Sequence, residues 1–482
     1  MTRTVLKDGF LAYFDAQEAR INAFCTLDKS LVENGNSAFF AVKDNIAVKG
    51  MEMSSGSEML RGFVSPYSAH AVQKLEAAGY KVLGKTNTEE FGLGSGTDSS
   101  VFGLSHNPWL LGAAAANLEA TECGMPSADG GAAAVAAGLV PFTLGSDSGG
   151  SLRRAAAFCG VSGFKPTQGT VSGYGLSAMA SGMETIGIIS AGSAIAKEVF
   201  RLIRGYDPMN MQSMNWPEST GDLARKTVAK AKKIGVLNLE ALCKSVSSDL
   251  GIAAGRLLEP GLTEVYGLWA EKFRELGYEI VTVDVPAMRY ASQAYHVIVS
   301  ALASANLARF DGIRYGFRDK SAESHEEVYT LSRRHGFGKE SLLQILLGTH
   351  ILGQENKAAF YYGAEKLRSL IIEDYKTAFA ACDAILSPVN PQLGYHKDHA
   401  AAQKEIAHDF LLAGPSLAGL PAVVFQGSMA ATGKGQQCKM PVGAQLCGPA
   451  FSDELLLELA AEYEKAYPPA HPEGYKEMWR LA

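Results

Sequence analysis

The stretch from Gly130 to Leu144 is the sequence feature that most limits how this chain can fold. It is the longest apolar segment, it is rich in alanine and glycine, and Pro141 interrupts it. A membrane-spanning helix needs roughly 20 apolar residues, so this segment is too short to be one. We therefore expect a small-residue helix over 132–138, a buried strand over 140–145, and then the glycine loop 146–151.

Strand and helix patterns also alternate earlier in the chain. A short apolar run from Phe39 leads into the polar cluster 43–45, as at the end of a buried strand. Ser68 is placed to cap a helix that continues through Ala78 and stops at Gly79, and the strand YKVLGKT follows. This alternation predicts an α/β unit.

The rest of the chain continues the α/β pattern after a change of character. Between about residues 194 and 379 the segments are longer, helical and decorated with charge, which suggests a helical insert or cap. Strand signals return in DAILSP, AVVF and PVGAQLCG, and an amphipathic helix is expected over 452–463. Since there is no internal repeat or Pro/Ser-rich linker, we expect one α/β domain over 1–482, with a central twisted mixed sheet covered by helices.

Composition excludes several classes of protein. Hydrophobic residues make up 47% and charged residues 20%, as in chains that bury a large core. A net charge of -6 gives no basic surface for binding nucleic acid without a partner. The seven cysteines are scattered without a CxxC pair, which argues against a disulfide framework and a zinc site. The N-terminus does not read as a signal peptide, so we expect a cytoplasmic protein with no membrane association.

Three segments combine reactive side chains with very small neighbours: AVKDNI around Lys43, MPSADGG around Ser127 and GSDSGGS before and at Ser151. A serine is a weak nucleophile until a base takes its proton. A lysine can act as that base only when it is neutral, and burial favours the neutral form. Because Lys43 follows a buried strand, we expect a neutral amine there.

The glycine loop can supply backbone donors. Ser148, Gly149 and Gly150 present successive N–H groups with little side-chain obstruction, as the oxyanion hole of an acyl-transfer enzyme requires. Ser151 at the end of the loop would be the attacking group. Taken alone, such a loop is more often a tight turn with a capping serine, and a phosphate cradle is disfavoured because no Gly-Lys-Ser/Thr follows.

These residues together resemble the amidase signature family. The match lies in Lys43 within VKDN, in Ser127 and in Ser151, and the two serines lie 24 positions apart as in that family. The resemblance implies a Ser-Ser-Lys triad without a metal or organic cofactor. Ser151 would be the nucleophile, Ser127 would relay the proton from a position at a cis peptide, and Lys43 would be the base.

Further segments resemble one branch of the family, the glutaminase component of glutamyl-tRNA(Gln) amidotransferase. They include GKTNTEEFGLGSGTDSSVFG, YGLSAMASGMETIG and LAGLPAVVF, and the resemblance spans roughly Phe39 to Tyr463. It implies glutamine hydrolysis, with ammonia passing to a B subunit that contacts the tRNA and uses ATP and Mg²⁺, and with a C subunit that serves as a clasp. Tyr295 and Asp409 would hold the glutamine.

The sequence departs from the family pattern at two functional places. Residues 124–126 read Gly-Met-Pro where the family has Pro-Gly-Gly, and Ala128, Asp129 and Gly131 replace small residues of the family pattern. Gln344 stands where the family has an arginine for the α-carboxylate of the substrate. Loss of that charge-assisted contact would weaken glutamine binding by roughly 1.5–3 kcal/mol.

Two other functions remain open for such a chain. It could be a stand-alone amidase that acts on another small carboxamide, or a degenerate paralogue that binds without catalysis. Arg153 and Asp147 flank the glycine loop and are interpreted as supports for it. His396 and His399 are interpreted as part of a surface loop, because a metal site would need a third ligand nearby.

Overall fold

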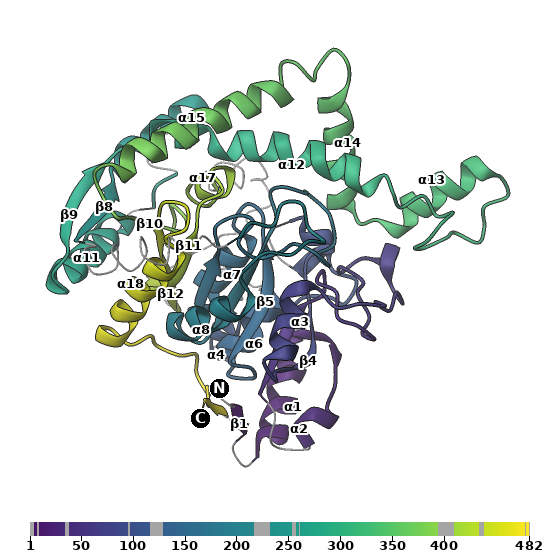
Figure 1. The fold of residues 1–482 in the computed structure, drawn as a ribbon, viewed down its shortest axis with the longest axis horizontal. Coiled ribbons are helices and arrows are strands. Elements are labelled where there is room, and N and C mark those ends of the chain that lie inside the picture. The colour runs from purple at the N-terminus through teal and green to yellow at the C-terminus, as the bar shows by residue number, and fades with distance from the viewer. Residues whose placement is uncertain are drawn as a thin grey trace.

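A computed structural model describes residues 4–6, 9–33, 38–94, 97–115, 129–215, 232–252, 257–259, 261–393, 409–432, 438–477 and 479–481. Among these, one large mixed sheet of eleven strands forms the centre of the molecule, in the order β2-β4-β3-β5-β7-β6-β11-β12-β10-β8-β9 (Figure 1). This confirms the expected central mixed sheet. Its strands are β2 (Phe24–Leu27), β3 (Phe39–Lys43), β4 (Lys81–Thr86), β5 (Phe142–Asp147), β6 (Ser162–Lys165), β7 (Thr185–Ser190), β8 (Lys233–Leu237), β9 (Glu279–Val283), β10 (Ala384–Pro388), β11 (Ala422–Thr432) and β12 (Cys438–Cys447).

The sheet changes strand direction along its width. Strand β3 runs parallel to both β4 and β5, whereas β7 runs antiparallel to β5 and β6. At the far edge, β8 is parallel to β10 and β9. Outside the sheet, β1 (Thr4–Leu6) pairs antiparallel with β13 (Trp479–Leu481), which brings the two ends of the chain together (Figure 1).

Helices cover both faces of the sheet. They are α1 (Phe10–Ile21), α2 (Ser30–Glu33), α3 (His70–Ala77), α4 (Pro108–Ala115), α6 (Gly130–Ala136), α7 (Ser151–Cys159), α8 (Ser193–Ile203), α10 (Leu239–Asp249), α11 (Leu262–Glu275), α12 (Ala291–Leu307), α13 (His325–Gly336), α14 (Lys339–Leu352), α15 (Tyr361–Phe379), α17 (Phe410–Leu417) and α18 (Asp453–Ala466). Short 3-10 turns occupy Glu58–Leu60, Glu90–Gly92, Thr97–Ser99 and Pro286–Tyr290. None of the helices within these described ranges is both long and apolar enough to cross a membrane.

Strand β6 shows how the two faces are divided. A Cβ on Gly163 would lie 2.5 Å from Cβ of Ala156 in α7, so this position allows the helix to approach closely. The next residue, Phe164, packs its ring 5.3 Å from that of Phe200 in α8. Because successive strand residues point to opposite faces, α7 and α8 lie on opposite sides of the sheet.

The long apolar stretch 130–144 forms the predicted helix and strand. All residues of α6 and of β5 are buried. Small side chains make this possible, since a Cβ on Gly130 would lie 2.3 Å from the carbonyl oxygen of Ala23. Helix α6 thus packs on the sheet beside the strand end where the chemistry was predicted.

The predicted cap of helix α3 is wrong. The helix begins at His70, its N-cap position is Ala69, and no side chain caps it. The hydroxyl of Ser68 instead accepts a hydrogen bond from the backbone N–H of Lys49. The hydroxyl that would cap the helix is therefore bound to a segment distant in the sequence. Gly79 follows the helix with a φ of 88° and ends it as expected.

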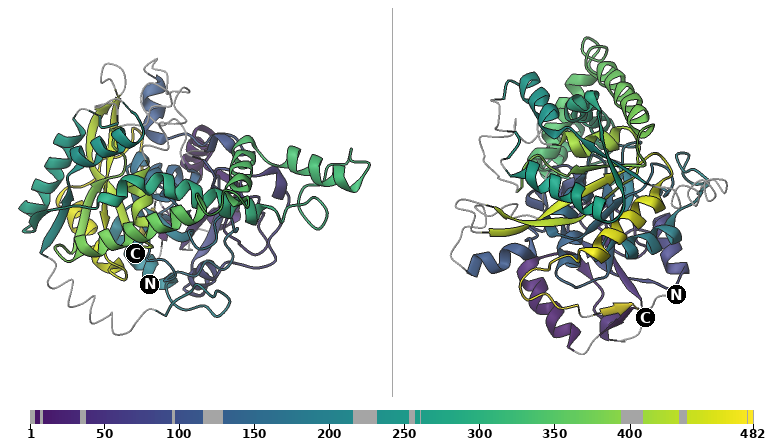
Figure 2. Two further views of the ribbon diagram at one scale, coloured as in Figure 1. Left: turned by 90° about the horizontal axis from the view of Figure 1, so that it is seen from above. Right: turned by 90° about the vertical axis from the view of Figure 1, so that its left-hand side faces the viewer.

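Between about 194 and 379, helices α12, α14 and α15 lie along one end of the molecule, and α13 projects away from the sheet (Figures 1 and 2). The same interval also supplies β8 and β9 to the sheet. The N-terminal part of α12 reaches the glycine loop, because the Tyr295 hydroxyl lies 2.8 Å from Oγ of Ser148. This helical section therefore forms one wall of the predicted site.

Candidate active site

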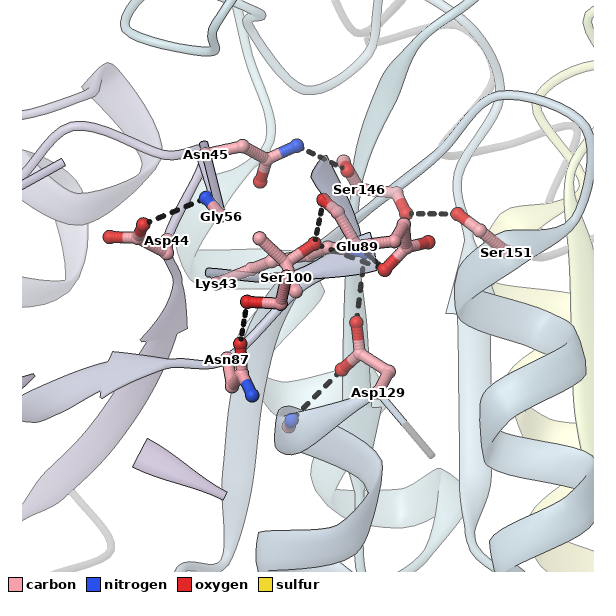
Figure 3. A network of polar contacts seen from close by, with 12 residues as sticks. Lys43, Asp44, Asn45, Gly56, Asn87, Glu89, Ser100, Asp129, Ser146 and Ser151 are labelled. Atoms are coloured by element: carbon pink, nitrogen blue, oxygen red, sulfur yellow. Dashed lines mark hydrogen bonds and ion pairs between the residues drawn. The ribbon is translucent and has the colours of Figure 1, made fainter. Parts of the chain in front are cut away.

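Lys43 is the last residue of β3, and its side chain is only 1% exposed. Its ammonium nitrogen lies 2.8 Å from Oδ2 of Asp129 and 3.3 Å from Oε2 of Glu89 (Figure 3). Asp129 directly precedes α6, and Glu89 follows β4 on the neighbouring parallel strand. Two carboxylates from different elements therefore meet the predicted base.

The surroundings of Lys43 oppose the predicted neutral amine. Burial alone would lower the pKa of this amine, but the carboxylates of Asp129 and Glu89 outweigh it and hold the pKa above its usual value. Burial likewise opposes ionisation of Glu89, yet Lys43 keeps the pKa of its carboxyl below the usual range. The burial of Lys43 was predicted correctly, but its carboxylate partners Asp129 and Glu89 lie far from it in the sequence.

A third buried acid, Glu184, lies within the electrostatic influence of Lys43. Burial raises the pKa of Glu184 to about 7, while two backbone N–H groups and the charge of Lys43 oppose that rise. The two N–H groups belong to Met179 and Ala180, each 3.0 Å from Oε2. Lys43 thus lies in a buried acidic environment.

Ser151 is the first residue of α7, at the end of the glycine loop. Its hydroxyl donates to the carbonyl oxygen of Ser146 over 3.0 Å. The amide of Asn45 donates to Oγ of the same Ser146 over 2.8 Å, which ties the segment after Lys43 to the end of β5 (Figure 3). Ser127, the predicted relay with its cis peptide, lies outside the described residues, as do His396 and His399.

The two glycines of the loop are required by their neighbours. A Cβ on Gly149 would lie 2.2 Å from Cζ of Tyr295. Gly150 has a φ of 118°, which disfavours any side chain, and a Cβ there would lie 2.5 Å from Cβ of Leu412. The loop therefore runs tightly between α12 and α17, and its direction into α7 is fixed.

A buried ion pair braces the loop from behind. The guanidinium of Arg153 donates to both carboxylate oxygens of Asp147, each over 2.9 Å, and neither side chain is exposed. Burial opposes ionisation of Asp147, but Arg153 lowers the pKa of its carboxyl. The remaining donors of Arg153 reach Gln445, Ser416 and the carbonyl of Leu412. Both side chains are therefore interpreted as structural supports of the glycine loop, since their polar groups are bound within the protein.

The predicted substrate residues Tyr295 and Asp409 lie at this loop. Tyr295, on α12, contacts Ser148 through its hydroxyl, and burial raises the pKa of that hydroxyl. Asp409 directly precedes α17, and its Oδ1 accepts from the guanidinium of Arg154 over 2.7 Å. The charges of Asp409 and Arg154 both act on Tyr295, so the three groups lie near one another. Of the three, Arg154 is on α7, one helical turn after Ser151.

Gln344 occupies a different setting. It lies on α14, where its amide oxygen accepts from the hydroxyl of Ser300 over 2.6 Å and its amide nitrogen donates to Glu340 over 3.0 Å. Ser300 belongs to α12, so the glutamine ties α14 to that helix. Both polar ends of the side chain are occupied by protein.

Sequence reasoning did not assign a role to Glu89, Asp129, Glu184 or Arg154. Asp129 did stand out as a charge where the family pattern has a small residue, and that substitution was the only signal of the pair with Lys43. Among the residues with described positions, no group of three or more histidine, cysteine, aspartate or glutamate side chains could hold a metal ion. The described site thus combines the predicted nucleophile Ser151 with charged neighbours.

Comparisons with known proteins identify the family of this chain. The family model described as Amidase matches residues 38–457. The chain is 40% identical to the A subunit of glutamyl-tRNA(Gln) amidotransferase from Protochlamydia amoebophila, over 91% of this chain and 84% of the relative. It is 34% identical to the protein of that name from Halothermothrix orenii, over 95% and 92%.

Solved structures give the same result for the fold. The A subunit of glutamyl-tRNA(Gln) amidotransferase from Thermotoga maritima superposes with a TM-score of 0.70 at 28% identity, covering 98% of this chain and 93% of that one. The peptide amidase of Stenotrophomonas maltophilia shares the fold with a TM-score of 0.71 at 22% identity, covering 97% and 94%. With a matching family model over most of its length and relatives of this similarity, the chain belongs to the amidase family.

Proposed function

We propose that this chain is the glutaminase subunit of a glutamyl-tRNA(Gln) amidotransferase. It would hydrolyse glutamine and supply ammonia for the conversion of misacylated Glu-tRNA(Gln) to Gln-tRNA(Gln). The observation that carries the proposal is the cluster at the start of α7: Ser151 begins the helix, Tyr295 contacts Ser148 of the glycine loop, and Asp409 pairs with Arg154 of the helix. The names of the relatives, at 34–40% identity over most of the chain, support the choice of glutamine.

The proposed chemistry begins with attack of Ser151 Oγ on the carboxamide carbon. The serine proton passes through Ser127 to Lys43, which must be neutral at that moment. Backbone N–H groups of Ser148, Gly149 and Gly150 stabilise the oxyanion of the tetrahedral intermediate. The intermediate then collapses, ammonia leaves after accepting the proton, and water releases glutamate from the ester.

We also propose the partners that this role requires. A B subunit would accept the ammonia, contact the tRNA and use ATP and Mg²⁺, and a C subunit would clasp the two larger subunits. This chain would contribute neither metal nor organic cofactor to the reaction. The complex would act in the cytoplasm. A net charge of -6 is consistent with tRNA being held mainly by another subunit.

One observation favours a second candidate, a stand-alone amidase for another small carboxamide. The carboxylate of Asp409, expected to help hold the glutamine, is already paired with Arg154. The arginine expected for the α-carboxylate is replaced by Gln344, whose amide is bound to Ser300 and Glu340. A substrate without the two charged groups of glutamine would fit such a site.

Ammonia release from glutamine and from a set of simple neutral amides separates these functions. Wild type and Ser151→Ala are compared, each alone and with candidate B and C subunits. The proposal expects Ser151-dependent turnover of glutamine that the partners stimulate. Turnover of neutral amides alone would establish the stand-alone amidase, and absence of Ser151-dependent turnover under every condition would establish a degenerate paralogue.

A further inference from the structure

The carboxylate nearest to Lys43 is held in place by its own helix. Oδ1 of Asp129 accepts from the backbone N–H groups of Gly131 and Ala132, over 2.8 and 3.4 Å, as the N-cap of α6. The other oxygen, Oδ2, lies 2.8 Å from the Lys43 amine. One side chain therefore caps a buried helix and binds the predicted base at once.

The pair is shielded from water. The side chains of Lys43 and Asp129 are 1% and 6% exposed. A pair in such surroundings is screened far less than a surface pair, and its ions do not exchange freely with solvent. An ammonium ion has no lone pair, so it cannot accept a proton from a serine. The geometry thus opposes the role that the mechanism requires of Lys43.

We infer that Asp129 is a positioning residue that holds Lys43 as an ammonium ion, so that the chain hydrolyses amides at neutral pH only when this ion pair opens. The inference rests on the proposed role of Lys43 as the base for Ser151. It adds a restraint on that site, namely a carboxylate that keeps the base protonated in the resting protein. Opening of the pair, by a partner or substrate that draws Asp129 away, would then start the reaction.

Other titratable groups near the Lys43–Asp129 pair limit how far removal of Asp129 can lower the pKa of Lys43. Glu89 approaches Lys43 from the segment after β4, at 3.3 Å, and also accepts from the hydroxyl of Thr88. Glu184 acts on Lys43 from the segment before β7. Cys159 of α7 lies in the field of Asp129, and its thiol pKa is raised mainly by burial. Removal of Asp129 therefore leaves other carboxylates near Lys43, and its loss should lower the pKa of the amine without abolishing the ammonium form.

The test uses Asp129→Asn, which keeps an oxygen for the helix cap but removes the charge. A fluorophosphonate probe measures the nucleophilicity of Ser151 without any assumption about the amide: Oγ bonds to phosphorus, fluoride leaves, and the serine proton passes to the base. Labelling rates are measured from pH 6 to 10 on the full chain, and the modified residue is mapped by mass spectrometry. Asp15→Asn is the matched control, because Asp15 pairs with Lys29 at the same 2.8 Å on the exposed surface.

Asp129→Asn should label at least tenfold faster than wild type at pH 7, since a pKa lowered by one unit raises the neutral fraction of the amine tenfold. Asp15→Asn should behave as wild type. Equal or slower labelling of Asp129→Asn would overturn the inference. Should this variant fail to fold, Asp129→Ser replaces it, because serine also caps helices.

A second readout follows the amine itself. The ¹³Cε signal of Lys43, assigned by its loss in Lys43→Met, should remain that of an ammonium ion up to pH 10 in wild type and should titrate at lower pH in Asp129→Asn. A neutral Lys43 in wild type at pH 8 would overturn the inference. Faster labelling of Asp129→Asn without glutamine turnover would contradict the proposed glutaminase function while supporting the ion-pair restraint.

Discussion

The two halves of the site differ in how they are prepared for catalysis. On the nucleophile side, the glycine loop is fixed by close contacts, and its charges, Asp147 and Arg153, are paired with each other behind it. On the base side, two carboxylates contact the reactive group itself. In the proposed mechanism the loop needs no rearrangement, whereas the ion pairs of Lys43 must open before the amine can act as a base. Burial alone therefore does not determine the protonation state of a charged residue, because nearby charged groups also shift its pKa.

A second lysine in the same sheet sharpens this comparison. Lys165, in β6, is as deeply buried as Lys43, but its pKa is lowered to about 8, by burial first and then by the nearby charge of Arg153. Its amine donates to the carbonyl of Pro166 over 3.2 Å. Asp147 and Asp453 act on this amine in the opposite direction, but burial has the larger effect. Burial can therefore lower the pKa of a lysine in this sheet, whereas the two carboxylates beside Lys43 raise the pKa of that amine.

The largest effect is expected on the nucleophile side. Ser151→Ala removes the attacking oxygen and should reduce amide hydrolysis by roughly 10³-fold or more in kcat. Steady-state ammonia release measures this, and Ser369→Ala, on the surface of α15, serves as the control because its hydroxyl only bonds to the carbonyl of Glu365. Activity retained in Ser151→Ala would remove the nucleophile assignment.

The buried Arg153–Asp147 pair behind the loop should have the largest effect on the free energy of unfolding. Arg153→Met leaves the carboxylate of Asp147 buried without its partner, which costs about 3–5 kcal/mol of the free energy of unfolding. Urea denaturation measures this cost. Arg274→Met breaks an exposed pair with Glu271 and should leave the unfolding midpoint unchanged. An equally small effect at both positions would mean that the two halves are not braced differently.

The tight path of the loop gives the next effect. Gly149→Ala places a methyl group against the ring of Tyr295, so the loop or the tyrosine must shift, at a cost of about 1–3 kcal/mol and with loss of activity. Gly267→Ala is the control, since a Cβ in that exposed position of α11 meets no atom within 4 Å and should stabilise by about 0.5–1 kcal/mol. Thermal unfolding and ammonia release report both outcomes. Full activity of Gly149→Ala would show that the loop is not fixed.

The Arg154–Asp409 pair tests which amide the site prefers. If glutamine is the substrate, Arg154→Gln frees the carboxylate of Asp409 for the α-ammonium group, and KM for glutamine should fall roughly tenfold. Arg61→Gln, which removes an exposed partner of Glu58, should leave KM unchanged. A rise in KM for glutamine together with lost turnover of neutral amides would favour the stand-alone amidase.

The smallest effect concerns the buried acid beside Lys43. Because the pKa of Glu184 is raised to about 7 in the folded state, its contribution to stability is full below the unfolded value of about 4.3 and is lost as pH rises through 7. Glu184→Gln should therefore flatten the pH dependence of the unfolding midpoint between pH 5 and 8. An unchanged slope would mean that Glu184 ionises in the fold as it does in the unfolded chain.

The fold could largely be predicted from local pattern. The apolar run of β3 and the small residues of α6 each indicate a buried element whatever lies around them, and the structure confirms both. The failure at Ser68 has a different cause, because the N–H of Lys49 competes for its hydroxyl from across the fold. Local signals identify elements but not the long-range partners of a single polar group.

Long-range partners also explain which features of the site the sequence did not predict. The sequence marked Lys43 and Ser151, and resemblance to a family marked Tyr295 and Asp409. The charge state of Lys43 depends on Asp129 and Glu89, which reach it from other elements through tertiary packing. Periodicity and propensity do not report such approaches, so the burial of Lys43 was predicted but its two carboxylate partners were not.

The central claim is that Ser151 carries the acyl group of glutamine during turnover. The most direct measurement is rapid quenching of the full chain, with its partners, during glutamine hydrolysis, followed by mass spectrometry of the peptide that contains residues 151–153. The account predicts a glutamyl ester on Ser151 that is absent from Ser151→Ala. Steady hydrolysis of glutamine with the acyl group on another residue, or with equal turnover in Ser151→Ala, would contradict it.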